Sequence, residues 1–430
     1  MNSRVEVVGA PALDCRNARS APSSVEDRSI GVLAVVPDAW NHIVMPRHQI
    51  LKRLTRHFPV VWVEPAAGWR EYWLPSGDRF LQADRWSTPA PGLDVLTPGW
   101  SHPSFVRPRW LGTWMMRSRL AAARRRLTSR GATHVVLYVW RDEYADALDL
   151  VAHDGSCYHI DDEYSFQERE VPNSPRETRL LQRVDQVIVH SPALLAKKGS
   201  ANPNITRVPN GVDYTSYSAS KPVPPDLAAV PHPRVGYAGI IKKQLDVALL
   251  VRMARARPDY SFVLVGPIMN ITGKEAAVEE LRRLPNVHFL GNKDPELLPA
   301  YVQHFDACLM CYEVNDYTKY IYPLKLNEYL ATGRPTISSP IDTVVDLGAL
   351  VAIARTDAQW LAAVDKALEP AESAADRVEA RRSFARANDW DSLVDRIAAR
   401  LRAAVDRNAV AQVQSAPRQI SESNENGHHS

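Results

Sequence analysis

The sequence predicts an α/β protein of two doubly wound, Rossmann-like domains that face a central cleft. Short β-branched runs alternate with helical patterns along most of the 430 residues, as in βαβ units with parallel sheets. The runs are nearly continuous in apolar residues, as expected for strands covered on both faces. The alternation stops once, at the proline-rich segment 213–233. Two sheets joined by such a hinge place a ligand cleft at the carboxyl ends of their strands.

The expected elements follow from the apolar period. The expected strands of the first half lie at 30–36, 60–64, 133–139, 156–160, 186–190 and 205–208. Those of the second half lie at 234–238, 261–265, 287–290, 307–311, 335–338 and 350–353. Helices are expected between them, among others at 245–256, 275–283, 295–304 and 325–332, and at the end at 356–368, 371–388 and 391–406.

These elements predict a domain order. We expect a disordered tail at 1–28, a first domain at 29–212, a linker at 213–233, a second domain at 234–390, a helix at 391–407 that crosses back to the first domain, and a disordered tail at 408–430. The linker carries five prolines after Lys221 and no apolar period. Both tails are polar and lack a period, which is typical of disorder.

Composition narrows the class of protein. The chain is 45% hydrophobic and 23% charged with a net charge of +3, which is ordinary for a globular protein and too small to indicate nucleic-acid binding. No apolar stretch approaches the ~20 residues of a membrane span, and the start lacks the apolar segment of a secretory signal. Four cysteines in this length form no disulfide framework, so we expect a cytoplasmic protein.

The segment YPLKLNEYLATGRPTISSP, at 322–340, is the most informative motif. Pro323 favours a helix start, and Gly333 favours a helix end with positive φ. The first backbone N–H groups of this helix suit a phosphate, Lys325 adds a charge, and Glu328, one turn on, suits sugar or ribose hydroxyls. The alternative is an ordinary amphipathic helix with a surface Lys–Glu pair.

Two further segments carry candidate residues. In VGYAGIIKKQLD, at 235–246, a buried strand opens at a glycine, and Lys242 and Lys243 precede a helix, where they can meet a diphosphate. The alternative is a solvated lysine pair at a helix start. In RVPNGVD, at 207–213, the Asn-Gly pair predicts a tight turn at the end of a strand.

Taken together, these segments resemble a known family. VPNGVD, GYAGII with its lysine pair, LPNVHFLG and PLKLNEYLATGRPTISSP occur in the order and roughly the intervals of GT-B fold glycosyltransferases of family 4. PRHQILKRLTRHFPVVWVEP and YHIDDEYS look like one bacterial branch of it, that of teichuronic acid biosynthesis. The resemblance covers about residues 30–405.

The resemblance implies a retaining, metal-independent transfer of a sugar from a nucleoside diphosphate sugar, of UDP or GDP type, with no further cofactor. It assigns the first domain to the acceptor and the second to the donor. Glu328 would bind the ribose, and Leu324 and Lys325, with Lys242 or Lys243, the phosphates. Leu290, Gly291 and Asn292 would flank the base. The family's usual second glutamate, eight positions before Glu328, is here Tyr320.

The catalytic group of the first domain is sought at strand ends. A group near the anomeric carbon must support oxocarbenium-like charge and orient the acceptor hydroxyl. The candidates are Asp161 and His159, followed by Asp162, Glu163, Arg141, Asp142, Arg47 and His48. The alternative for His159 is a position in the core, because its side chain and that of its neighbour Ile160 point to opposite faces of the strand. The acidic run at 161–163 has the alternative of capping a helix.

A basic, tryptophan-containing helix is predicted after residue 105. Val95 to Arg141 contains nine arginines and no acidic residue. Docking on an anionic membrane surface would use the residues Trp110, Trp114, Arg117, Arg124, Arg125 and Arg126. The alternative is an amphipathic helix whose aromatic face is core.

The function predicted from these features is a glycosyltransferase of cell-envelope polysaccharide or glycolipid assembly. Its expected partners are a nucleotide sugar, a lipid-linked or saccharide acceptor and an anionic membrane surface, with peripheral attachment to the inner face of the plasma membrane. The alternatives are a nucleotide-sugar 2-epimerase of the same fold and a non-catalytic nucleotide-sugar binding module. No metal site is expected, since Cys308 and Cys311 lie in the apolar run DACLMCY without a second pair.

Overall fold

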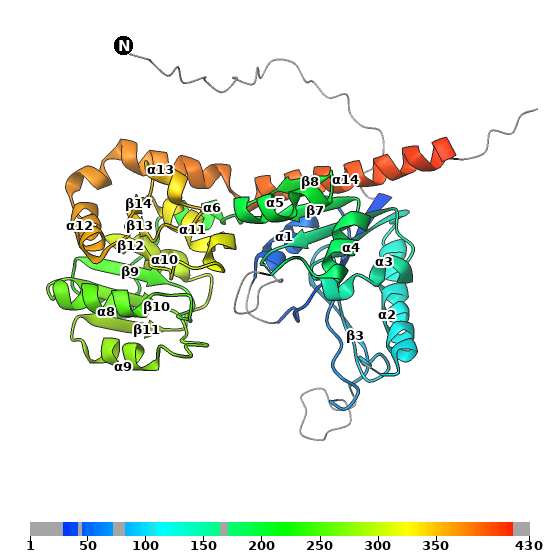
Figure 1. Cartoon of the computed structure of the whole chain (residues 1–430), viewed down its shortest axis with the longest axis horizontal. Coiled ribbons are helices and arrows are strands. Elements are labelled where there is room, and N and C mark those ends of the chain that lie inside the picture. Colours follow the sequence, from blue (N-terminus) through cyan, green and yellow to red (C-terminus); the bar gives the residue numbers. More distant parts are fainter. Residues whose placement is uncertain (1–28, 42–44, 72–81, 106, 164–170, 416–430) are drawn as a thin grey trace, which may run out of the picture.

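The structure, a computed structural model, describes residues 29–41, 45–71, 82–105, 107–163 and 171–415. Two sheets form two domains, and a long final helix runs from the second domain over the first (Figure 1). The predicted tail at 1–28 lies outside the described residues, as does the part of the predicted tail at 408–430 that begins at residue 416.

The first domain is built on a mostly parallel sheet of eight strands among the described residues, in the order β3-β4-β2-β1-β5-β6-β7-β8. Only β3 is antiparallel to its neighbour. The strands are β1 (Ile30–Val35), β2 (Val60–Val63), β3 (Arg85–Ala90), β4 (Leu93–Thr97), β5 (His134–Val139), β6 (Gly155–Ile160), β7 (Gln186–Val189) and β8 (Ile205–Arg207). Its helices are α1 (Pro46–Leu54), α2 (Arg109–Ser129), α3 (Ala147–Leu150), α4 (Pro175–Arg183) and α5 (Pro192–Lys198).

The second domain carries a fully parallel sheet in the order β11-β10-β9-β12-β13-β14. Its strands are β9 (Arg234–Ala238), β10 (Ser261–Val265), β11 (Val287–Gly291), β12 (Ala307–Met310), β13 (Thr336–Ser338) and β14 (Ala352–Ile353). The helices after β8 are α6 (Tyr214–Ser218), α7 (Pro225–Ala228), α8 (Val247–Ala256), α9 (Glu275–Arg283), α10 (Leu298–Gln303), α11 (Leu324–Thr332), α12 (Asp357–Ala367), α13 (Ala375–Ala387) and α14 (Trp390–Ser415). The predicted α/β class with two Rossmann-like sheets is confirmed.

Strands β3 and β4 were not expected from the sequence. β3 is mostly exposed at the sheet edge, and β4 has Asp94 as its second residue. The Asp94 side chain is fully buried, and it accepts hydrogen bonds from Arg126 Nε at 2.9 Å and Thr88 Oγ1 at 2.7 Å, and from Arg130. These partners hold the pKa of Asp94 well below its usual range, which allows a charged residue in a buried strand.

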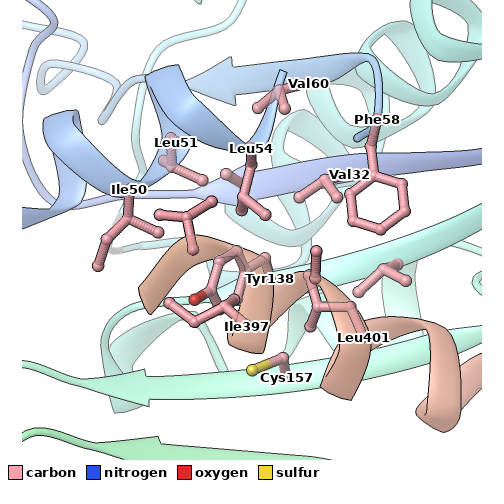
Figure 2. Close-up of a cluster of buried hydrophobic side chains, with 14 of the residues drawn as sticks. Val32, Ile50, Leu51, Leu54, Phe58, Val60, Tyr138, Cys157, Ile397 and Leu401 are labelled. Carbon is pink, nitrogen blue, oxygen red and sulfur yellow. The ribbon is translucent and has the colours of Figure 1, made fainter. Parts of the chain in front are cut away.

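Helix α14 completes the core of the first domain rather than that of the second. Ile397 and Leu401 of α14 are fully buried between α1 and strands β1, β5 and β6, where they meet Leu51 and Tyr138 (Figure 2). The helix passes Asn408, where the tail was expected to begin, and ends at Ser415. The first domain therefore contains both the first and the last of the described helices and strands.

The two connections between the domains lie against each other. Val212 N donates to Asn388 O at 3.1 Å, and Trp390 N donates to Val212 O at 3.0 Å. The predicted linker, 213–233, is not a free spacer. It contains α6 and α7, whose Tyr217 and Leu227 are buried in the core of the second domain. The proline-rich composition concealed these two short helices.

Candidate active site

The helix α11 presents a lysine and a glutamate at the carboxyl edge of the second sheet. It starts after Pro323 and ends at Gly333, whose φ of 78° confirms the predicted left-handed helix end. Among the described residues no side chain caps its first turn, so the first N–H groups stay open to an anion. Asn210 of the predicted turn holds this start in place, because its Nδ2 donates to Tyr322 O at 2.7 Å.

Lys325 lies over the end of strand β9. Its Nζ is 4.9 Å from the centre of the Tyr237 ring, and a Cβ placed on Gly239 would come within 2.4 Å of that nitrogen. Only glycine leaves room for the lysine there, and its φ of 139° suits glycine as well. Burial lowers the pKa of Lys325 to about 8, while the nearby Glu328 carboxylate opposes that shift.

Glu328 is half-buried one turn along α11, with its carboxylate held by Tyr217 of α6. Burial raises the pKa of Glu328, whereas Lys325 and the Tyr217 hydrogen bond lower it. Tyr217 was missed by the sequence analysis, since nothing in its local pattern marks it. The Lys325–Glu328 pair is not a solvated surface pair, because both side chains are partly buried against these tyrosines.

The other predicted donor residues lie at neighbouring loops. Lys242 and Lys243 are both exposed after β9, and the positive charge of Lys242 lowers the pKa of Lys325 and of Asp162 in the first domain. Gly291 ends β11, and its carbonyl accepts from Gly266 N at 2.8 Å at the end of β10.

The remaining residues named for the donor differ in exposure. Asn292 is exposed, and the half-buried Leu290 packs on the core of the second domain. Leu324 packs against the hydrophobic core of the first domain rather than standing free.

In the first domain an arginine joins two carboxylates. Arg47 of α1 is buried, and its guanidinium lies 3.0 Å from Asp38 Oδ2 and 3.2 Å from Asp161 Oδ2. Asp161 follows β6, and its side chain is 4% exposed. The expected cleft-facing carboxylate is thus a largely covered partner of Arg47.

His159 lies in the core, as the alternative interpretation had it. It is 3% exposed, its ring stacks on Trp140 with 4.3 Å between centroids, and its Nδ1 is 2.6 Å from the Tyr138 hydroxyl. Burial holds the pKa of His159 well below its usual value, so the ring is neutral. In this conformation the structure does not present His159 to a ligand, and its role as a catalytic residue loses support.

Asp162, the neighbour of Asp161, is the carboxylate that reaches the second domain. Its Oδ2 accepts from the Tyr317 hydroxyl at 2.8 Å, and burial raises its pKa while the Tyr317 hydrogen bond and the Lys242 charge oppose the shift. Lys242, Lys325 and Asp162 are therefore brought together from the two domains. Tyr317 had no signal in the sequence.

Glu163 has a structural role. It is buried 3.3 Å from Lys198 Nζ, which also bonds Glu177 Oε1 at 2.7 Å. Asp142 lies at the start of a 3-10 helix, where it accepts from Ser174. His48 is buried beside Trp62.

Tyr320 joins the domains at the position where the resembling family usually has glutamate. It is 2% exposed and belongs to a hydrophobic cluster of the first domain, although it follows β12 of the second. The ammonium groups of Lys197 and Lys319 lie 5.3 and 4.8 Å from its ring centre. The Tyr320 side chain is buried in the contact between the two domains, so it does not replace the family glutamate in contacting the donor sugar.

The arginines of α2 do not all face solvent. Trp110 and Trp114 are 71% and 58% exposed, which corrects the alternative of an aromatic core face. Arg117 and Arg125 are exposed as well. Arg126, however, binds the buried Asp94, and Arg124 donates to Ala152 O at 3.1 Å. The docking set predicted from sequence therefore loses Arg126, and Arg124 is only half-exposed.

Comparison with known proteins finds a family similar to the second domain. Residues 232–370 match the model of the family described as Glycosyl transferases group 1. Most of the second domain is thus similar to group 1 glycosyl transferases. The chain is also 31% identical over 231 residues to the putative teichuronic acid biosynthesis glycosyltransferase TuaH of Bacillus subtilis (strain 168), an alignment covering 51% of this chain and 57% of that relative. The chain thus matches little more than half of this curated relative.

Solved structures show the same fold at low identity. A trehalose-6-phosphate structure from E. coli with UDP-2-fluoro glucose has a TM-score of 0.62 at 13% identity, with 86% of this chain and 99% of that chain covered. The α,α-trehalose 6-phosphate synthase of Burkholderia multivorans has a TM-score of 0.62 at 15% identity, with 91% and 100% covered. The two domains therefore have the GT-B fold, of which the second domain is the second half.

Two further observations concern metal ions and membranes. Among the described residues no group of three or more His, Cys, Asp and Glu side chains is placed to hold a metal ion, and Cys308 and Cys311 are buried. None of the helices in the described part of the chain has the length and apolar content to cross a bilayer.

Proposed function

We propose that the protein is a cytoplasmic glycosyltransferase that moves a sugar, with retention and without a metal ion, from a UDP or GDP sugar to an acceptor hydroxyl. The acceptor is a saccharide or glycolipid of cell-envelope assembly. The similarity to group 1 glycosyl transferases and the likeness to TuaH support this class of reaction. The observation that carries the proposal is the pair on α11 of Lys325, packed against Gly239, and Glu328, held by Tyr217.

The chemistry follows from the charges at this edge. When the glycosidic bond breaks, the diphosphate gains negative charge, which Lys325, Lys242 and the first N–H groups of α11 are positioned to stabilise. Glu328 provides a fixed acceptor for ribose hydroxyls, because Tyr217 orients its carboxylate. Two lysines and a helix start supply the charge that a divalent ion would otherwise provide.

Nucleotide binding tests this site directly. UDP or GDP at 100 times its dissociation constant should stabilise the protein by about 2.7 kcal/mol, which raises the unfolding temperature by several degrees. We expect the shift with one of these nucleotides, equally with magnesium and with a chelator, and not with ADP or dTDP. Glu328→Gln should abolish most of it. Thermal unfolding of the purified protein measures each value.

The matched control is Glu296→Gln, which changes an exposed glutamate of the same domain and should leave the shift unchanged. A nucleotide shift that survives in Glu328→Gln would contradict the ribose role of Glu328. A shift that requires magnesium would contradict metal independence.

One observation favours a second candidate function, a non-catalytic nucleotide-sugar binding module. Tyr320, at the family glutamate position, is buried between the domains. A binding module would give the nucleotide shift without any transfer. Release of UDP or GDP that depends on an added acceptor separates the transferase from the module, and also from a 2-epimerase, which needs no acceptor.

We also propose that α2 docks the protein on the anionic inner face of the plasma membrane. At the 100° per residue of an α-helix, Trp110, Trp114, Arg117 and Arg125 fall on one face. The buried residues of α2, Leu120, Ala123 and Leu127, lie on another. Exposed tryptophans beside cations are typical of a helix that lies in the membrane interface.

The vesicle test follows from this face. The protein should co-sediment with phosphatidylglycerol vesicles at low salt and be released at high salt, because surface attraction is screened. The double variant Arg117→Gln/Arg125→Gln should lose most of the binding. The control Arg377→Gln/Arg400→Gln removes two exposed arginines of α13 and α14 and should retain it. Equal binding to neutral and anionic vesicles would contradict electrostatic docking.

A further inference from the structure

The first domain contains a pocket that the donor site does not use. It lies between α2 and the carboxyl ends of β1 and β2, with the 3-10 helix Asp142–Tyr144 and α3 on its far side, and has a volume of about 580 Å³. Its wall includes Glu64 after β2, Arg109 and Arg119 on α2, and Glu143 beside Tyr144. A volume in this range suits a small ligand of sugar size.

The charges of this pocket differ from those of the donor site. Glu64, Glu143 and Asp146 supply carboxylates, whereas Arg109 and Arg119 supply guanidinium groups. Three acids against two bases do not favour a phosphate or a carboxylate ligand. Carboxylates accept hydrogen bonds from hydroxyl groups, and guanidinium groups donate hydrogen bonds to hydroxyl oxygens. A wall with both kinds of group therefore suits an uncharged ligand with many hydroxyls.

Apolar side chains complete the wall. Phe105 and Tyr144 lie in it with Met116 and Leu120 of α2. Phe105 stacks on the ring of Trp69, with 6.4 Å between centroids, and Trp69 is 43% exposed. Such a surface covers the C–H face of a pyranose ring, while the charged groups bind its hydroxyl edge.

The pocket is connected along the chain to the predicted reaction site. Val36 forms part of the wall, and two residues later Asp38 pairs with Arg47, which pairs with Asp161. Trp40 N, in turn, donates to Glu64 Oε1 of the wall at 2.7 Å. The segment 36–40 therefore joins the pocket to the carboxyl edge of the sheet, at which Asp161 and Asp162 lie.

We infer that this pocket binds the acceptor, and that the group it binds is a neutral saccharide rather than a phosphorylated or acidic sugar. The assignment of this saccharide as the acceptor rests on the proposed transferase function. The residues that select the saccharide are Glu143 and Arg119, with the buried Glu64 of the wall.

Saturation-transfer NMR on the full chain tests the inference. The probes are methyl glucoside, methyl galactoside and N-acetylglucosamine as neutral saccharides, and glucose 6-phosphate and glucuronate as anionic ones, each with and without UDP or GDP. We expect saturation transfer from the protein to at least one neutral probe and no saturation transfer to the anionic probes. Thr113→Trp, which fills the pocket from α2, should weaken that binding at least tenfold.

The matched control is Thr128→Trp, the same change on the same helix outside the pocket, which should bind as the unmodified protein does. Glu143→Gln should weaken binding without filling the pocket. The nucleotide shift in thermal unfolding, recorded on every variant, shows that Thr113→Trp is folded.

Three results would overturn the inference. They are saturation transfer to the anionic probes alone, saturation transfer to no neutral probe, or binding of a neutral saccharide that Thr113→Trp leaves intact. Loss of the nucleotide shift in the unmodified protein, with saccharide binding retained, would instead count against the transferase function.

Discussion

Replacing Lys325 by Met is expected to lower the rate of sugar transfer by about 10²- to 10³-fold, the usual cost of removing one group that stabilises a developing negative charge. Its ammonium group is held over Gly239 and against the Tyr237 ring, near the start of α11 at which the diphosphate is expected. Lys366→Met is the control, because Lys366 is exposed on α12, was not predicted to bind the donor, and should change the rate only slightly. Initial rates of nucleotide release measure both variants.

The same lysine sets an expected pH dependence. Burial lowers its pKa from 10.5 to about 8, so the free protein loses this charge as the pH rises through 8. A bound diphosphate favours the charged form, and binding above pH 8 must take up a proton. The affinity for UDP or GDP should therefore be flat below about pH 8 and fall by up to about tenfold per pH unit above it. An affinity unchanged up to pH 9.5 would contradict this role for Lys325.

Replacing Lys198 by Ala is expected to cost about 3–5 kcal/mol of unfolding free energy, the usual result of leaving a buried charge without its partner. The Lys198 side chain is fully buried, with its Nζ 2.7 Å from Glu177 Oε1, 3.3 Å from Glu163 Oε1 and 3.0 Å from Asn173 Oδ1. Its loss leaves two buried carboxylates close together, and Glu163 follows directly on Asp162.

Chemical denaturation measures this change, and Lys366→Ala is the control. Lys366 is exposed on α12, and its removal should alter the unfolding free energy by no more than about 0.5 kcal/mol. A cost below about 1 kcal/mol in Lys198→Ala would show that the carboxylates find other partners or take up protons.

The second domain was the more predictable half of the fold. Strands β9 and β10 have the bounds that their apolar runs predicted, because each is covered on both faces. Strand β4 was missed because its buried Asp94 is acceptable only with Arg126 and Arg130, which come more than 30 residues later. The same pairing removed Arg126 from the predicted membrane surface.

The site was predictable where it depends on one helix. Lys325 and Glu328 follow from the pattern of a single segment, since residues three apart on a helix share a face. The choice between Asp161 and Asp162 depends on which neighbour meets Arg47 and which meets Tyr317 across the domains. Contacts of this kind join distant parts of the chain, so no local sequence pattern predicts them. Tyr217 and Tyr317 were missed for that reason.

The crossing of α14 has a consequence for the order in which the protein is made. Ile397 and Leu401 belong to the core that also contains Val32 and Leu51, so the amino-terminal domain lacks one layer of its interior until the carboxyl-terminal residues have left the ribosome. Of these two domains, the one that is translated earlier is therefore completed later. Until then the apolar surface that receives α14 is uncovered and open to chaperones.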